Sequence, residues 1–374
     1  MGLALAACSG DVVAPKPLPL ASVSAGNGHA CGITPAGAVY CWGYNGFGDL
    51  GNGATTSTTT AVAVSSTLTF TAVSVGDAVG VLGQHTCGLT GAGAAHCWGY
   101  NAFGALGNGN TTSSAIPVAV SGGLTFVAVS AGGTHTCGLT STGAAYCWGY
   151  NVYGELGDST RTDSQAPVPV SGGLTFATVS SGSLHTCAVT AVGAAYCWGF
   201  NFDGQLGDGT TTNRSTPVAV SGGLNFAAVS SGGQHTCGIT PAGAAYCWGN
   251  SGYGQLGSGT TSYADSAKPV AVSGGLTFAA VSSGAFHTCG VTNAGAAYCW
   301  GHNSTGELGN GTTTNSAIPV AVSGALRFSA VSGGNLNTCA LTTAGTAYCW
   351  GQNSYGELGN GTTRGSSTPV RVGQ

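Results

Sequence analysis

Charge is scarce in this sequence. Charged residues make up 5% of the 374 residues, with seven basic and 11 acidic side chains. The basic residues are scattered, so no basic patch is available to bind phosphates, and the composition argues against nucleic-acid binding. No apolar run reaches the roughly 18 residues of a membrane-spanning helix. We therefore expect neither a nucleic-acid partner nor a transmembrane segment.

Motifs that indicate catalysis are also missing. The sequence has no HExxH motif, no phosphate-binding GK[ST] loop, no Ser-His-Asp order and no conspicuous pair of carboxylates. We therefore predict a protein that is not an enzyme, with no catalytic residue, no cofactor and no bound metal.

Repetition is what the sequence has in abundance. The segment HTCGITPAGAAYCWG, residues 235–249, has relatives in seven units that recur about every 50 residues. Such a period indicates one closed array rather than the two or three domains typical of this length. No unit has helical periodicity, and short apolar runs alternate with Gly- and Asn-rich turns. The pattern predicts an all-β fold in which each unit forms four antiparallel strands, as in a propeller blade.

Each unit contains two cysteines ten positions apart, which together use fourteen of the fifteen cysteines. Numbered from the N-terminus, the seven units contain Cys31 and Cys41, Cys87 and Cys97, Cys137 and Cys147, Cys187 and Cys197, Cys237 and Cys247, Cys289 and Cys299, and Cys339 and Cys349. In unit 1, a three-residue loop at 35–37 that ends on a left-handed glycine places the two cysteines opposite each other, and Ile33 opposite Val39. Opposed cysteines on antiparallel strands lie within disulfide range, so we predict seven disulfides and an oxidising compartment. Zinc ligation and buried free thiols are the alternatives, although zinc sites usually have shorter Cys spacings.

The hairpin has two different faces, because side chains alternate along a strand. In unit 1, Tyr40 and Trp42 share one face with Gly32, while the cysteines and aliphatic residues share the other. We expect the small residue at position 32 to leave room for the ring of the opposing tyrosine. The Tyr/Trp face of one blade is predicted to pack against the Cys face of its neighbour and so to form the core.

The run GGxHTCGLT…GAAYCWGxNxxGxLGxGxxT…PVAV resembles the repeat of the regulator of chromosome condensation family, over residues 20–374. The resemblance implies a seven-bladed β-propeller with blades of four antiparallel strands, whose ring closes between the chain ends, here 20–26 and 368–372. The family's eukaryotic namesake is a nuclear exchange factor for a small GTPase and binds chromatin. This chain departs from it in its cysteine pairs and its lack of basic charge. The chain is also similar to secreted bacterial propellers that bind a partner with one ring face.

The N-terminal segment MGLALAACSG contains Leu5-Ala6-Ala7-Cys8, which resembles the lipobox of bacterial lipoproteins. The alternative is an ordinary apolar N-terminus, since the basic and longer apolar regions of a complete signal peptide are missing. We predict a truncated lipoprotein signal segment at 1–8, a Pro-rich tether at 9–19 and the propeller at 20–374. Cys8 is then the lipidation site, and the lipid is the only attachment to a membrane.

Two further recurring features are interpreted as structural. Six units carry a histidine two residues before their first cysteine, and unit 7 has Asn337 there: His29, His85, His135, His185, His235 and His287. Equivalent residues of a propeller surround a wide channel, so we predict a hydrogen bond that Asn337 can also make, rather than a metal site or a pH switch. The GxLGxG loop is expected to place its leucine between blades. Asp158 and Asp208 leave weak calcium binding open in two of these loops.

Departures from the repeat are the candidate partner-binding positions, because loops carry the specificity of a propeller. The alternative is neutral drift of loop sequences. The candidates lie in an insertion at 77–83, in a smaller one around 263–265 and in the loops of units 3 and 4: Asp77, Val81, Leu82, Arg161, Asp163, Arg214, Tyr263 and Asp265.

The hypothesis that best fits these features is a monomeric, non-catalytic propeller of the bacterial cell envelope or exterior. It would be lipid-anchored or secreted and would bind a protein or glycan through one ring face. The alternatives are a guanine-nucleotide exchange factor, as in the family's namesake, and a hydrolase or lyase with its site at one mouth of the channel.

Overall fold

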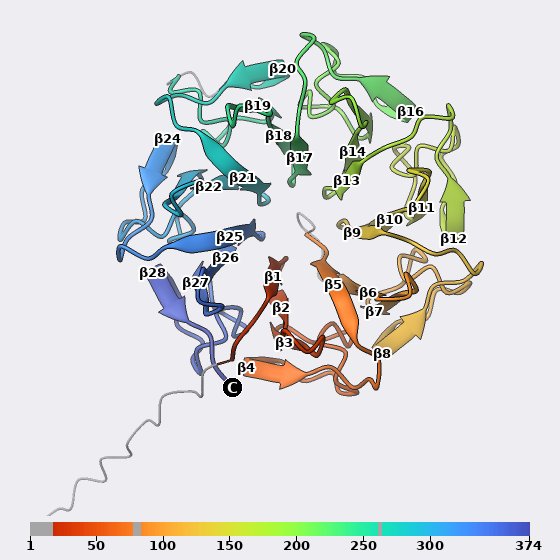
Figure 1. Cartoon of the computed structure of the whole chain (residues 1–374), viewed down its shortest axis with the longest axis horizontal. Helices are drawn as coiled ribbons and strands as arrows, with labels where there is room; N and C mark the ends of the chain where they lie inside the picture. Colours follow the sequence, from red (N-terminus) through yellow and green to blue (C-terminus); the bar gives the residue numbers. More distant parts are fainter. Residues whose placement is uncertain (1–17, 78–83, 261–263) are drawn as a thin grey trace, which may run out of the picture.

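The computed structural model describes residues 18–77, 84–260 and 264–374. In this part of the chain, 28 strands form seven four-stranded antiparallel sheets, which are arranged as blades around a central axis (Figure 1). The predicted all-β, seven-bladed propeller is confirmed. The described residues contain no helix that could span a membrane.

Each blade is formed by one sequence unit, and its strands follow in chain order from the channel to the perimeter (Figure 1). The innermost strands are β1 (Ser22–Ala25), β5 (Phe70–Val75), β9 (Ala128–Ala131), β13 (Thr178–Ser181), β17 (Ala228–Ser231), β21 (Phe278–Ser283) and β25 (Phe328–Gly333). The second strands are β2 (His29–Ile33), β6 (His85–Thr90), β10 (His135–Leu139), β14 (His185–Val189), β18 (His235–Ile239), β22 (His287–Thr292) and β26 (Asn337–Thr342). The third strands are β3 (Val39–Gly43), β7 (Ala95–Gly99), β11 (Ala145–Gly149), β15 (Ala195–Gly199), β19 (Ala245–Gly249), β23 (Ala297–Gly301) and β27 (Ala347–Gly351). The outermost strands are β4 (Thr58–Ala63), β8 (Ser114–Ala119), β12 (Ser164–Pro169), β16 (Arg214–Ala219), β20 (Ser266–Ala271), β24 (Ser316–Ala321) and β28 (Ser366–Arg371).

The hairpin between the second and third strands has the predicted register. In blade 1, Cys31 pairs with Cys41 and Ile33 with Val39, and Gly37 has a φ of 83°. Such a register brings the two cysteines of a blade within bonding distance.

All seven predicted disulfides are formed, with Cα–Cα distances of 4.0–4.1 Å. The bonds join Cys31 to Cys41, Cys87 to Cys97, Cys137 to Cys147, Cys187 to Cys197, Cys237 to Cys247, Cys289 to Cys299 and Cys339 to Cys349. Zinc ligation and free thiols are therefore not supported for these cysteines. Seven disulfides in one chain indicate an extracellular or secreted protein.

The core lies between neighbouring blades, as predicted. Between blades 1 and 2, Ile33, Val39 and the disulfide pack with Trp98 of blade 2. Leu50, from the GxLGxG loop of blade 1, belongs to the same cluster and is completely buried, so the predicted role of this leucine is confirmed. All seven tryptophans are completely buried in equivalent clusters.

The small residue opposite the tyrosine leaves room for a different aromatic ring from the one that we expected. A Cβ atom at Gly88 would lie 2.5 Å from the ring of Phe70, the first residue of the innermost strand of the same blade. This phenylalanine recurs in blades 2–7, where its ring centroid lies 5.6–6.1 Å from that of the blade's tryptophan. The expectation for the tyrosine ring was wrong, because the phenylalanine covers that position.

A belt of serines joins the innermost strands around the channel. In each blade a serine Oγ accepts the backbone N–H of the next blade at 2.9–3.0 Å. The seventh bond, from Ala25 N–H to Ser332 Oγ, joins blade 1 to blade 7. The belt therefore includes the seam between the chain ends. Its members are Ser24, Ser74, Ser130, Ser180, Ser230, Ser282 and Ser332.

The ring closes without exchanging a strand between blades. The segments predicted to close it lie at the seam, but 20–26 belongs to blade 1 and 368–372 to blade 7. At the N-terminal side, Leu18 and Leu20 are buried in the cluster between blades 7 and 1, and Pro19 forms a bridge with Thr346. Leu18 and Pro19, which we assigned to the tether, therefore contact the propeller.

At the C-terminal side, the Ala61 N–H of β4 donates to the Gly373 carbonyl at 3.0 Å. The other six units have proline at the position of Ala61, as in the PVAV runs. Proline removes the N–H from an exposed strand edge and blocks further pairing. Unit 1 has alanine because its N–H is needed for closure.

We predict that Ala61→Pro destabilises the propeller, because it removes the donor to Gly373. The other six units have proline here, so the outermost strand of a blade accommodates this residue. The expected loss is about 1 to 3 kcal/mol in the free energy of unfolding, measured by urea denaturation with the disulfides intact. Pro117→Ala, at the equivalent position of blade 2, is the control and should change stability little. Equal stability of Ala61→Pro and wild type would contradict this account of closure.

Candidate functional site

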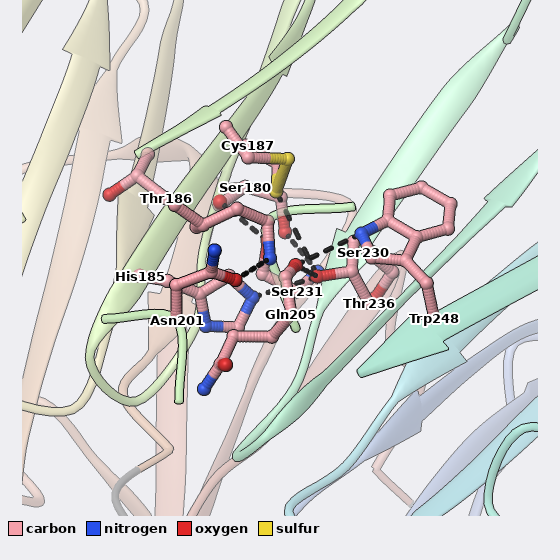
Figure 2. Close-up of a disulfide and its surroundings, with 12 residues drawn as sticks. Ser180, His185, Thr186, Cys187, Asn201, Gln205, Ser230, Ser231, Thr236 and Trp248 are labelled. Carbon is pink, nitrogen blue, oxygen red and sulfur yellow. Dashed lines mark hydrogen bonds between the residues drawn. A yellow bond between two sulfur atoms is a disulfide. The ribbon is translucent and has the colours of Figure 1, made fainter. Parts of the chain in front are cut away.

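The recurring histidines belong to a hydrogen-bond network between blades. His185 Nε2 lies 2.8 Å from Thr236 Oγ1 of the next blade (Figure 2). Thr236 Oγ1 donates to the Gln205 carbonyl, which also accepts from the Trp248 indole N–H, each at 2.9 Å. Because the hydroxyl proton is used in this way, the neutral histidine must donate from Nε2. Burial lowers the pKa of these histidines to about 3 or 4, so they remain neutral in the folded protein.

The same bond recurs at 2.6–2.8 Å for all six histidines, but the seam lacks it. Asn337 takes the place of the histidine, and the threonine of the next blade is replaced by Ala30. The amide nitrogen of Asn337 has no partner. The expectation that Asn337 makes the same bond was therefore wrong, since its acceptor is missing as well.

Asp158 and Asp208 are engaged within their own loops. Asp158 Oδ1 accepts bonds from Asn151 Nδ2 and from the Thr160 N–H. Asp208 accepts two bonds from the Arg214 guanidinium, at 2.9 and 3.0 Å. Among the described residues, no three His, Cys, Asp or Glu side chains gather where they could hold a metal ion.

The described candidate partner-binding residues are distributed over blades 2 to 5. Arg214 is bound to Asp208 of blade 4, whereas Asp163 accepts the Asn151 N–H of blade 3 and Asp265 the Ser251 N–H of blade 5, each at 2.8 Å. Arg161 is exposed, and Asp77 is partly buried beside the channel strands. Val81, Leu82 and Tyr263 lie outside the described residues, as does Cys8.

The two ends of the strands form two different faces of the ring. The loops between third and fourth strands share one face with the short connections between first and second strands, because successive strands are antiparallel. We name it the long-loop face. Apart from the undescribed residues 78–83 and 261–263, it comprises 44–57, 100–113, 150–163, 200–213, 250–265, 302–315 and 352–365, with 26–28, 76–84, 132–134, 182–184, 232–234, 284–286 and 334–336.

Aromatic side chains follow one another across the long-loop face. Ring contacts link neighbouring blades from blade 7 through blades 1, 2 and 3 to blade 4, with centroids 4.8–6.3 Å apart. We name this set the aromatic arc: Tyr355, Tyr44, Phe47, Tyr100, Phe103, Tyr150, Tyr153, Phe200 and Phe202. A separate cluster of Tyr253, Phe286 and His302 lies in blades 5 and 6.

The arc was missed at the level of the sequence, although a signal for it is present. In units 1 to 3, an aromatic residue follows each WG pair and another stands three positions later. Phe202 is 65% exposed and Tyr355 40%, so the two ends of the arc are open to solvent.

Hydrogen bonds within each loop fix the backbone of the loops that carry the aromatic arc. Asn151 Oδ1 accepts the Leu156 N–H at 2.9 Å, and its Nδ2 donates to the Thr162 carbonyl at 3.1 Å. The Tyr153 N–H donates to the Glu155 carboxyl, whose pKa burial raises to about 8. These bonds fix the loop backbone and leave the aromatic rings at the surface.

Comparisons with known proteins agree with this architecture. A model of the RCC1-like domain matches residues 123–374, and models of the regulator of chromosome condensation (RCC1) repeat match 21–49, 36–82 and 92–139.

Solved structures of similar fold are known. Human WBSCR16 is 22% identical with a TM-score of 0.80, covering 90% of this chain and 93% of that chain. Prp20p from Saccharomyces cerevisiae, described together with its binding to Gsp1p and histones, is 20% identical with a TM-score of 0.79, covering 91% and 87%. The CRINKLY WD40 ectodomain of the Arabidopsis thaliana receptor kinase ACR4 is 21% identical with a TM-score of 0.57, covering 95% and 98%. At these identities the likeness concerns the fold alone.

We predict that His185 and Thr236 are energetically coupled. His185→Asn and Thr236→Ala should each lower the free energy of unfolding by about 1 to 3 kcal/mol, since each leaves a buried polar group without its partner. The double variant copies the natural pair Asn337 and Ala30, and it should lose less than the sum of the two single variants. Urea denaturation of the four proteins measures the coupling, and strict additivity would refute it.

The same variants should show a defined pH dependence. The pKa of His185 is about 3 in the folded protein, against an ordinary value of 6.5, so the unfolded chain binds more protons between these values. The stability contributed by neutral His185 is therefore present above pH 6.5 and is lost as the pH falls. The stability difference between wild type and His185→Asn should shrink below pH 6.5, by up to about 1.4 kcal/mol per pH unit. A difference that stays constant between about pH 7 and pH 4 would contradict a buried neutral histidine.

Proposed function

The chain belongs to the family of RCC1-like domains, and from this premise we propose that it is a non-catalytic protein that binds a protein or glycan partner on its long-loop face. The observation that carries this proposal is the aromatic arc. Aromatic side chains supply much of the binding energy at protein interfaces, because they bury a large area with few rotatable bonds.

The rigidity of the loops supports the same conclusion. Hydrogen bonds to the loop backbone fix the positions of the arc residues in the free protein, so little conformational entropy is lost on binding. The opposite face carries short hairpin turns instead of long loops. Val192 is 81% exposed there and lines a pocket with Ala227 and Pro241, whose small side chains offer less contact area than the rings of the arc.

The recurring histidines and two buried loop carboxyls support a non-catalytic role. The histidines with strongly lowered pKa values all bond to threonines of the next blade, where they join blades rather than face a substrate. Of the carboxyls with raised pKa values, Asp49 and Glu155 accept backbone N–H groups of their own loops. Perturbed pKa values are often a sign of catalysis, but structural networks perturb them in the same way.

Guanine-nucleotide exchange has weaker support than binding alone. The likeness to the yeast protein rests on 20% identity, which does not carry over an activity. The seven disulfides point to an extracellular or secreted protein, whereas exchange on a small GTPase would take place in a reducing compartment.

We also propose that the protein works outside a bacterial cell, held to the envelope by a lipid on Cys8. The lipobox-like run Leu5-Ala6-Ala7-Cys8 and the predicted tether at 9–19 support this placement, and the disulfides are compatible with it. A tether of this kind would let the ring turn either face to a partner.

Site-specific photo-crosslinking tests the binding face. A benzoylphenylalanine at position 202, at the open end of the arc, should crosslink to the native partner on intact cells. The same group at position 192, which is exposed on the opposite face, is the matched control and should not. Crosslinks from position 192 and none from position 202 would show that the partner binds the opposite face, and would overturn the proposed binding face.

Mass spectrometry of protein isolated from its own cells tests the anchor. The expected N-terminal peptide begins at Cys8 and carries acyl chains, and no peptide from residues 1–7 should remain attached. An intact Met1 or an unmodified Cys8 thiol would overturn the lipid anchor, while leaving the proposed binding face to be judged by the crosslinks.

A further inference from the structure

Charge is distributed unevenly between the two faces of the ring. The connections of the long-loop face contain ten of the 11 acidic residues of the sequence: Asp49, Asp77, Glu155, Asp158, Asp163, Asp203, Asp208, Asp265, Glu307 and Glu357. Arg161 and Arg364 lie in the same connections, and Arg214 begins the strand after one of them. The connections of the opposite face contain a single charged residue, Arg327. Four of these carboxyls, those of Asp49, Glu155, Glu307 and Glu357, are buried in the loops. The other six are exposed or half-buried and outnumber the three arginines, so the accessible charge of the long-loop face is acidic.

The aromatic arc ends in blades 3 and 4, in the loops that contain Asp163 and Asp203. The arc ends there in Tyr150, Tyr153, Phe200 and Phe202. The ring planes of Tyr153 and Phe200 are inclined by 68° with centroids 5.0 Å apart. Tyr153 and Phe200 are half-buried, whereas Phe202 is 65% exposed, so the negative π face of the Phe202 ring can receive a cation.

Carboxylates flank these rings. Asp163 is exposed, and its Oδ1 accepts the N–H of Asn151, the residue after Tyr150, at 2.8 Å. Asp203 directly follows Phe202 in the chain, and burial and the charge of Asp265 raise its pKa. Neighbouring like charges repel each other, and a cation bound between them relieves that repulsion.

We propose that the long-loop face of blades 3 to 5 binds a cationic segment of another polypeptide. Arginine or lysine side chains of that segment lie on the rings of Tyr153, Phe200 and Phe202. Their charges pair with the carboxylates of Asp163, Asp203 and Asp265. This inference rests on the proposed function, which assigns partner binding to the same face.

The charge and the ring geometry favour this partner over the alternatives. A neutral glycan has no charge that the carboxylates could attract. The rings are also inclined by 62–68° to each other, so they do not form a flat surface on which sugar rings could stack. A nucleic acid would be repelled by the acidic residues. A polypeptide can present several cations along its length, which matches carboxylates that are spread over three blades.

Calorimetric titration of the full, disulfide-bonded chain tests the proposal. The probe is a short peptide of alternating arginine and glycine. The control ligands are the same peptide with citrulline for arginine, the same peptide with glutamate for arginine, and a neutral oligosaccharide of N-acetylglucosamine. We expect binding of the arginine peptide that weakens with ionic strength, and affinity at least about tenfold lower for the citrulline peptide.

Matched variants assign the binding to these residues. Asp163→Asn and Asp265→Asn keep the loop intact, because Asn213 and Asn315 accept the same main-chain N–H in blades 4 and 6. Combined with Asp203→Asn, they should weaken peptide binding by at least about tenfold, as should Phe202→Ser. Val192→Ser on the opposite face should leave the affinity unchanged, and circular dichroism verifies that every variant folds.

The possible failures can be told apart. Equal affinity for the arginine and citrulline peptides, or wild-type affinity in the triple aspartate variant, overturns the cationic partner. If the neutral oligosaccharide binds instead and Phe202→Ser weakens it, the long-loop face remains the binding face and only the cationic partner is wrong. If Val192→Ser is the variant that weakens binding, both this inference and the proposed function fail.

Discussion

The structure depends on the docking of each blade onto the long loop of the blade before it. One loop carbonyl, such as that of Gln205, accepts bonds from the tryptophan and the threonine of the next blade. The leucine that follows, Leu206, packs against the same tryptophan, Trp248. Because the loop carbonyl and the leucine are held in the core, the aromatic residues on the other side of the loop are held at the surface. Blade packing thereby positions the aromatic arc.

Disulfides and packing act on different parts of the ring. Each disulfide joins the second and third strands of one blade, so it stabilises the blade by restricting its unfolded chain and adds no bond between blades. Contacts between blades come from the buried Trp–Leu clusters, the His–Thr bonds and the serine belt. The seam is where these contacts change: Asn337 and Ala30 replace the His–Thr pair, whereas Ala61 and Gly373 supply a backbone bond specific to the closure. Non-covalent contacts therefore close the ring.

Some features could be predicted because a repeat shows the same constraint seven times. The glycine at the end of the hairpin loop determined the register of the cysteines, and the register determined which cysteines are bonded. The serine belt was missed, since serine is common in every segment of this sequence and its bonding is visible only when two blades lie side by side. The expectation for Asn337 was wrong for the same reason. The position that should supply its partner lies in blade 1, at the other end of the chain, and holds alanine.

The number of blades, the strand order within each blade and the disulfides follow from the amino-acid sequence alone, because local periodicity and turns specify them. The distinctive surface became visible only in the assembled ring. The aromatic residues of the arc recur in pairs about 50 residues apart, and the acidic residues are scattered along the chain. The propeller brings both to one face, because every loop between third and fourth strands leaves its sheet at the same end. A pattern created by ring closure cannot be read from one unit alone.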